Sequence, residues 1–133
     1  MIISASYRTD IPAFYADWFA RRLAAGYCMV ANPYGGPDYR VSLKAEDVTA
    51  FTFWTRNAGP LLPLLEGMRG DGRHFSVTFS ILGYPRLVDE RVIDTESAIA
   101  QVKALQALHP RIPVWRYDPI LITDLTPPDW HRE

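Results

Sequence analysis

Residues 75–82 read FSVTFSIL, residues 112–117 read IPVWRY, and a helical pattern capped by Asp94 or Thr95 lies between them. Aromatic and β-branched residues favour strands, so the two outer segments are predicted as strands. An apolar stripe at helical period marks the intervening helix and consists of Ala98, Val102, Leu105 and Leu108. Strand, helix and strand joined by short connections favour parallel pairing through a right-handed crossover. This unit indicates an α/β fold.

The same alternation extends toward the amino terminus. Residues 49–55, TAFTFWT, are predicted as a strand. Residues 2–6, IISAS, are predicted as a further strand, and because they are all apolar or small we expect both of its faces to be covered.

Two more helices and a hairpin connect these strands. One helix is predicted from the N-cap Asp10 to Gly26, and a leucine-rich helix from Pro60 to residues 67–70. Turn formers at residues 32–37 predict a hairpin between residues 27–30 and 39–43. The aromatic residues at helical spacing in the first helix, expected in the core, are Phe14, Trp18 and Phe19.

Start signals for a further helix occur at residues 126–130, TPPDW, close to the last residue. We therefore expect parallel (β/α) units that form an incomplete, half TIM-type barrel with a β-hairpin insertion after the first helix. Residues 1–133 are expected to be a single partial domain, the amino-terminal half of the barrel, truncated at the start of the helix after the fourth strand.

Composition restricts the function classes. The chain has 133 residues, 14 Lys and Arg against 15 Asp and Glu, and a net charge of −1, so it lacks the broad basic field of a nucleic-acid-binding protein. The single cysteine, Cys28, has no metal-site spacing to the three histidines, so no metal site is expected. The apolar run at the amino terminus ends after Ile3, so we expect a cytoplasmic protein without membrane contact.

Charged and polar side chains follow the predicted strands. The carboxyl ends of parallel strands share one edge of a sheet, where functional groups gather. The predicted ligand-binding residues at this edge are Arg8, Asp10, Thr55, Arg56, Asn57, Arg116, Tyr117 and Asp118. Because guanidinium groups bind carboxylates and phosphates in a bidentate manner, the edge is predicted to bind an anionic or zwitterionic small molecule.

Other interpretations of these residues remain open. Asp10 is equally well explained as a helix cap, and Arg116 with Asp118 as a structural ion pair. A hydrolase that uses Asp10 or Asp118 as general base has the least support, because neither acid has an evident partner that would raise its pKa. No catalytic residue is assigned.

Five segments of the sequence occur in the same order as in a known family. SYRTDIPAFY, NP, FWTRN, GY and WRYDPI lie at residues 6–15, 32–33, 53–57, 83–84 and 115–120. Over essentially its whole length the chain resembles the uncharacterised bacterial family catalogued as domain of unknown function 1848. Members of that family are longer, so the resemblance implies an amino-terminal half. Tyr7 departs from the family pattern, which commonly has a second arginine there.

The resemblance also implies a chemistry. Longer members carry a C-x-x-x-C-x-x-C-type cluster like that of radical S-adenosylmethionine enzymes, whose partial barrels hold a [4Fe–4S] cluster and S-adenosylmethionine. Cys28 is not a counterpart of those cysteines, so this chain alone is expected to hold no cofactor and to be inactive. The alternative is a non-redox module that binds an anionic small molecule. The exposed sheet edges of a half-barrel predict self-association.

Overall fold

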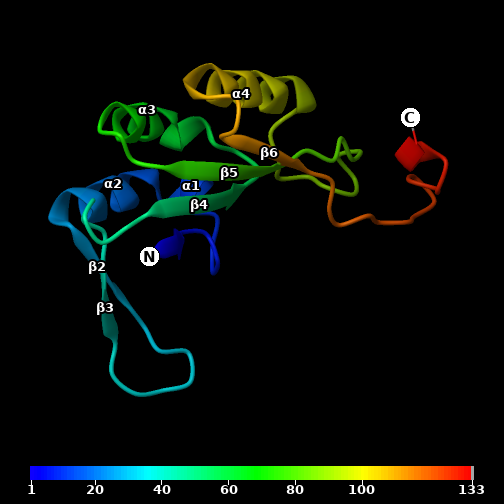
Figure 1. The fold of residues 1–133 in the computed structure, drawn as a ribbon. Helices are drawn as coiled ribbons and strands as arrows, with labels where there is room; N and C mark the ends of the chain where they lie inside the picture. The colour runs from blue at the N-terminus through cyan, green and yellow to red at the C-terminus, as the bar shows by residue number, and fades with distance from the viewer. Residues whose placement is uncertain (133) are drawn as a thin grey trace.

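The computed structural model describes residues 1–132 and contains a four-stranded parallel sheet (Figure 1). Its strands, in the spatial order β1-β4-β5-β6, are β1 (Ile2–Ser4), β4 (Ala50–Thr55), β5 (Phe75–Ser80) and β6 (Pro113–Arg116). Each neighbouring pair is parallel. The predicted α/β fold with a parallel sheet is therefore confirmed.

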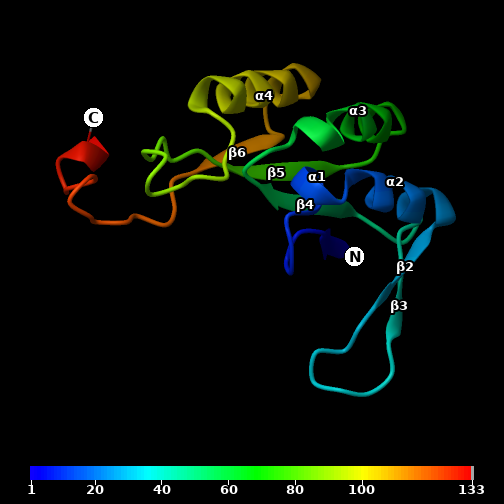
Figure 2. The same ribbon diagram turned by 180° about the vertical axis from the view of Figure 1, so that it is seen from behind.

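The helices lie between the strands in sequence. They are α1 (Ile11–Phe14), α2 (Ala16–Ala25), the 3-10 turn η1 (Gly59–Leu61), α3 (Leu62–Gly70) and α4 (Thr95–Leu108). In both Figure 1 and Figure 2, α3 and α4 lie over the same side of the sheet. The sheet thus has a helix-covered face and an opposite face.

The segment after β1 forms two helices, so the prediction of one helix from Asp10 to Gly26 is wrong. Asp10 does cap α1, but the backbone of Tyr15 leaves the helical region at φ −132° and separates α1 from α2. Gly26 ends α2 as predicted, in the left-handed conformation at φ 77°, which glycine adopts without steric cost.

The core lies between the sheet and the helices. Phe51 and Phe53 of β4 are almost fully buried, and Phe19 of α2 meets both rings edge-on, at centroid distances of 5.8 and 5.4 Å. Leu65 of α3 and Leu105 of α4 are also fully buried in this cluster. Buried aromatic pairs in this geometry stabilise a core beyond their area.

Two predictions of burial are wrong. Ile2 of β1 is 70% exposed, because β1 is an edge strand and its side chains alternate between the two faces of the sheet. Phe14 is 75% and Trp18 39% exposed, whereas Phe19 is buried. Phe14 lies on α1, before the break at Tyr15, and so does not continue the buried stripe of α2. Trp18 directly precedes Phe19 on α2, so the two side chains point about 100° apart around the helix.

The face of the sheet opposite the helices carries small hydroxyl side chains together with Trp54 and Val114, which are 48% and 50% exposed. In β4 and β5 the buried residues alternate with partly exposed ones, and the register pairs Thr52 with Ser76. The Ser76 hydroxyl donates to Thr52 Oγ1 at 3.2 Å. Thr78 and Ser80 continue the row along β5.

The predicted hairpin is confirmed. Strands β2 (Tyr27–Val30) and β3 (Tyr39–Ser42) pair antiparallel and form a separate two-stranded sheet. The hairpin projects away from the helix-covered body in both views (Figure 1, Figure 2). The Arg40 guanidinium lies 3.9 Å from the centroid of the Tyr27 ring, a cation–π contact across the two strands.

Residues 117–132 extend past the carboxyl end of β6 (Figure 1). The buried Tyr84 hydroxyl donates to the Pro119 carbonyl at 2.7 Å and accepts from the Leu121 amide at 2.8 Å, which ties this segment to the loop after β5. The predicted helix start at residues 126–130 is followed, within the described residues, only by the 3-10 turn η2 (Trp130–Arg132).

In the described chain, every helix is too short or too polar to pass through a lipid bilayer.

Candidate functional site

The carboxyl ends of β1, β4, β5 and β6 lie along one edge, because the strands are parallel and adjacent. Each predicted site residue is at or just after the end of β1, β4 or β6. The predicted residues therefore lie at the edge where the fold gathers its loops, but they form three separate groups.

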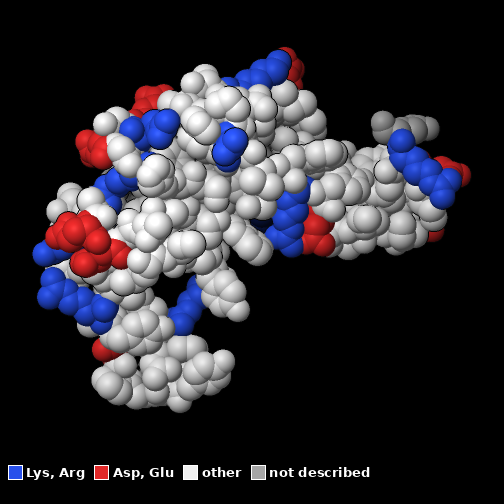
Figure 3. All heavy atoms as spheres, viewed as in Figure 1, with Lys and Arg blue, Asp and Glu red and all other residues white. Residues whose placement is uncertain are grey.

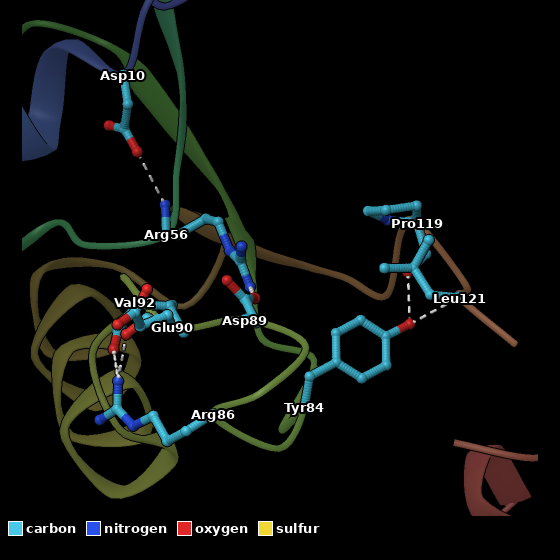
Figure 4. Close-up of polar contacts among 9 residues, drawn as sticks. All are labelled: Asp10, Arg56, Tyr84, Arg86, Asp89, Glu90, Val92, Pro119 and Leu121. Carbon is cyan, nitrogen blue, oxygen red and sulfur yellow. Dashed lines mark hydrogen bonds and ion pairs between the residues drawn. The ribbon is translucent and has the colours of Figure 1, made fainter. Parts of the chain in front are cut away.

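The first group centres on Asp10. Its Oδ1 accepts hydrogen bonds from the Ala13 amide at 3.0 Å and the Thr55 hydroxyl at 2.7 Å, and its Oδ2 accepts from the Arg56 amide at 3.1 Å (Figure 4). The same carboxylate thus caps α1 and joins the carboxyl ends of β1 and β4. The interpretation of Asp10 as a helix cap is confirmed.

Asn57 belongs to the same structural network. Its Oδ1 accepts from the Gly59 amide at 3.1 Å and from Gln101 Nε2 at 2.9 Å. Gln101 Oε1 accepts in turn from the Ala58 amide at 2.8 Å and the Gly59 amide at 3.0 Å. Asn57 therefore links the loop after β4 to α4 through Gln101, and its Oδ1 accepts two hydrogen bonds. The Thr55 hydroxyl donates to Asp10 and accepts from the Asn57 amide at 2.9 Å.

Arg56 differs from its neighbours because part of its guanidinium is unused. Its Nη2 forms an ion pair with Asp89, which lies in the loop after β5. Its Nε is buried and has no hydrogen-bond partner among the described residues. A buried donor without an acceptor is costly, so this N–H is a specific point at which a ligand acceptor would gain free energy.

Arg56 also lines a cavity of about 180 Å³. Arg56, Ser80 and Tyr84 line it from the ends of β4 and β5, and Arg86 and Thr95 line it from the following loop and the start of α4. Figure 4 shows Arg56 and Arg86 on opposite sides of the loop that carries Asp89 and Glu90. The cavity is thus formed at the carboxyl edge and has two guanidinium groups in its wall.

The polar residues around the cavity are held by the loop. Arg86 Nη1 donates to the Glu90 carbonyl at 3.1 Å and the Val92 carbonyl at 2.6 Å. Asp94 caps α4, and the hydrogen bonds from the Ser97 amide and hydroxyl lower the pKa of its carboxyl. Asp94 also lines the cavity, so its carboxylate, although hydrogen-bonded at the start of α4, places one negative charge beside the two arginines.

The second group lies at the end of β6. Arg116 forms an ion pair with Asp118, and its guanidinium lies 5.0 Å from the centroid of the Trp54 ring. This geometry supports the structural ion-pair interpretation. Tyr117 shares a hydrogen bond of 2.6 Å with His131 Nδ1, and loss of water contact, with a smaller effect of Tyr84, raises the pKa of the Tyr117 hydroxyl. These residues do not line the cavity beside Arg56.

The third group is Arg8 alone. Its Nη1 donates to the Ala31 carbonyl at 2.9 Å and so attaches the loop after β1 to the hairpin. Arg8 lines a different pocket, of about 430 Å³, between β1 and the hairpin. Of the eight predicted residues, only Arg56 lines the cavity at the carboxyl edge.

The sequence prediction missed Arg86, Asp89 and Thr95. Only their position in the chain could have indicated these residues, because all three follow the third strand of the sheet and precede or begin the next helix. That loop carries no motif beyond the GY segment at residues 83–84, so no ligand-binding residue was predicted there.

The family model described as Domain of unknown function (DUF1848) matches residues 2–133. The chain belongs to the DUF1848 family. No curated protein and no solved structure matches the sequence. For this DUF1848 member, the function therefore has to be argued from the geometry of its own residues.

The described residues do not fit the [4Fe–4S] cluster that the resemblance implies for longer members. Residues 1–132 contain no group of three or more His, Cys, Asp or Glu side chains placed to hold a metal ion. Cys28 lies on β2, and partial burial raises the pKa of its thiol against the opposing effect of Arg22. One protonated thiol on the hairpin does not provide the thiolate ligands of such a cluster.

Proposed function

We propose that this DUF1848 chain binds an anionic small molecule, a carboxylate or a phosphate, in the cavity beside Arg56. The observation that carries the proposal is the buried Arg56 Nε–H without a partner in residues 1–132. A carboxylate or phosphate oxygen at this position would satisfy that donor through a charge-assisted hydrogen bond.

Asp89 supports the choice of an anion. Its carboxylate, which is 18% exposed, already pairs with the Arg56 Nη2 edge. The Arg56 guanidinium therefore already binds one carboxylate in this environment, and its Nε–H remains to donate to a second acceptor. The cavity volume of about 180 Å³ limits the ligand, or the part of it that enters, to a small group.

Arg86 and Thr95 add groups suited to the same ligand. Arg86 uses Nη1 for two backbone carbonyls, and its positive charge remains in the cavity wall. Thr95 contributes a hydroxyl at the start of α4. Two cations and a hydroxyl around a small cavity are typical of sites that bind phosphate or carboxylate groups.

Calorimetric titration of the 133-residue protein with inorganic phosphate and with malonate tests the proposal and separates the two acceptor classes. Arg56→Met is expected to weaken binding about tenfold or more, because a charge-assisted hydrogen bond is lost. Asp89→Asn is expected to tighten binding, because it removes the carboxylate that competes for the same guanidinium. Arg91→Met changes an exposed arginine outside the cavity and is the matched control.

The opposite signs of the two variants separate binding from folding. Both substitutions disrupt the same ion pair, so a purely structural role for Arg56 would lower the melting temperature in both and change affinity in neither. Unchanged affinity in both variants, or no heat with either anion in the unsubstituted protein, contradicts the proposal.

The proposal extends to the finer architecture, an incomplete TIM-type barrel formed by residues 1–133 as one partial domain. It is supported by the parallel order of four strands, by helices over one face and by the hydroxyl row of Thr52, Ser76, Thr78 and Ser80 on the other. In a closed barrel that row would face the interior.

A second candidate function is a part in a radical S-adenosylmethionine-like iron–sulfur enzyme. The same hydroxyl-lined face favours it, since a polar interior suits a bound polar cofactor better than an apolar one. In this candidate the cysteine ligands come from a segment other than residues 1–132. Anaerobic iron and sulfide reconstitution of a longer family protein, followed by its visible spectrum, tests it, and the 133-residue chain is expected to stay colourless.

A further inference from the structure

A second concave site lies at the opposite ends of the strands. It is a pocket of about 370 Å³ formed where α3 runs into β5 and where α4 runs into β6. The basic side chains that line it are Arg69, Arg73, His74, His109 and Arg111. The described lining includes neither Asp nor Glu. We propose that this basic pocket binds a compact polyanion of the diphosphate class.

The fold brings these residues together from two connections. The Val77 amide donates to the Ile112 carbonyl at 2.8 Å, and the Arg73 amide donates to the Met68 carbonyl at 2.9 Å. These bonds hold the segment between α3 and β5 beside the segment between α4 and β6. The pocket therefore rests on paired strands rather than on a single loop.

Hydrogen bonds within the chain account for only part of the basic groups. Arg73 Nη1 donates to the Leu43 carbonyl at 3.0 Å, and His109 Nδ1 accepts from the Arg111 amide at 3.2 Å. With Nδ1 as acceptor, His109 presents its Nε2 as the donor. The side chains of Arg69 and Arg111 make no hydrogen bond or ion pair within residues 1–132, so two complete guanidinium groups are available to a ligand.

Two features of the surroundings oppose an anion. The carboxyl ends of α3 and α4 bring partial negative charge, which by itself explains one or two cations. Acidic side chains also lie near basic ones at this end of the molecule (Figure 3). Two helix ends contribute about one unit of negative charge in total, whereas the described lining of the pocket has three arginines and neither Asp nor Glu, so the lining exceeds the charge of the helix ends.

The volume of the pocket and the number of its arginines fit the ligand class. A pocket of about 370 Å³ is roughly twice the cavity beside Arg56 and takes two linked phosphoryl groups. Arginine forks at separate positions suit a ligand with several anionic oxygens, because each fork holds two of them.

Titration with inorganic pyrophosphate, followed by calorimetry and by thermal shift at constant ionic strength, tests the inference. The double variant Arg69→Met/Arg111→Met is expected to weaken pyrophosphate binding about tenfold or more. The titrations are made in the Arg56→Met background, so that pyrophosphate bound at the other end of the strands does not contribute to the signal. Arg132→Met, an exposed arginine that lines neither site, is the control for nonspecific loss of positive charge.

Each outcome decides between the two sites. Loss of pyrophosphate binding when Arg69→Met/Arg111→Met is added to the Arg56→Met background supports the basic pocket, whatever the phosphate and malonate titrations show. Pyrophosphate affinity that the double variant leaves unchanged overturns it, as does absence of pyrophosphate binding in that background. If the double variant fails to fold, Arg69→Lys/Arg111→Lys keeps the charge but not the fork, and unchanged affinity in that variant overturns the bidentate assignment.

Discussion

The Asp10 carboxylate and the Thr55 hydroxyl lie 2.7 Å apart and join the carboxyl ends of β1 and β4. The same carboxylate caps α1 and accepts from the Arg56 amide. Three donors, one from α1 and two from the end of β4, therefore depend on one side chain. Because Arg56 follows directly, the backbone position of the proposed anion ligand is set by this junction.

Asp10→Ala is expected to reduce the free energy of unfolding by about 2–4 kcal/mol, since it removes a helix cap and leaves the buried Thr55 hydroxyl without an acceptor for its proton. Asp10→Asn keeps one acceptor and is expected to cost less. Urea denaturation measures both. Asp38→Ala removes an exposed acid of the hairpin loop as the control, and an equal loss in that variant would refute the role of the junction.

Gln101 makes a second link at this edge, from α4 to the loop after β4. Gln101→Leu is expected to destabilise the protein by about 2–3 kcal/mol, because the buried Ala58 amide loses its acceptor. Gln106→Leu on the same helix changes an exposed amide and is expected to shift stability by no more than about 0.5 kcal/mol. Similar denaturation midpoints for the two variants would show that the link contributes little.

The cap of α4 predicts a dependence of stability on pH. Hydrogen bonds from Ser97 lower the pKa of Asp94 in the folded protein, so its contribution is present above the unfolded pKa of about 3.9 and is lost as the pH falls through the folded pKa. Asp94→Asn keeps a cap oxygen that does not titrate. Thermal melts from neutral to acid pH are expected to show a smaller loss in the variant. A parallel loss in both proteins would assign the acid sensitivity elsewhere.

The edges of the sheet predict self-association. β1 and β6 each have one unpaired side within the described sheet, and Val114 and Trp115 of β6 are 50% and 67% exposed. Such edges pair readily with a second chain. Sedimentation of the 133-residue protein is expected to show species larger than a monomer, and Val114→Lys to reduce them. A cooperative monomer over the accessible concentrations would contradict this expectation.

The sequence predicted the parallel sheet because each strand is marked by aromatic and β-branched residues and each connection is short. It also predicted Asp10 as a helix cap, since an aspartate before Pro12 is a local signal. It could not predict that Phe14 is exposed, because the break at Tyr15 has no signal of its own.

The candidate site was harder to predict than the fold. Position at a strand end identified Arg56, but its partner Asp89 lies 33 residues later in a loop without a motif. The same criterion also selected Arg8 and Arg116, which are bound to Ala31 and Asp118 instead. Which guanidinium keeps an unused donor depends on tertiary contacts, and these are not encoded in local pattern.

The most direct measurement is the ¹H–¹⁵N resonance of the Arg56 Nε–H during titration with phosphate. If the buried Arg56 Nε–H donates to a ligand oxygen, this resonance is expected to shift downfield and to saturate. Its absence from the spectrum of Arg56→Met assigns it to Arg56. An Arg56 resonance that stays fixed while phosphate perturbs other residues would contradict the proposed binding site.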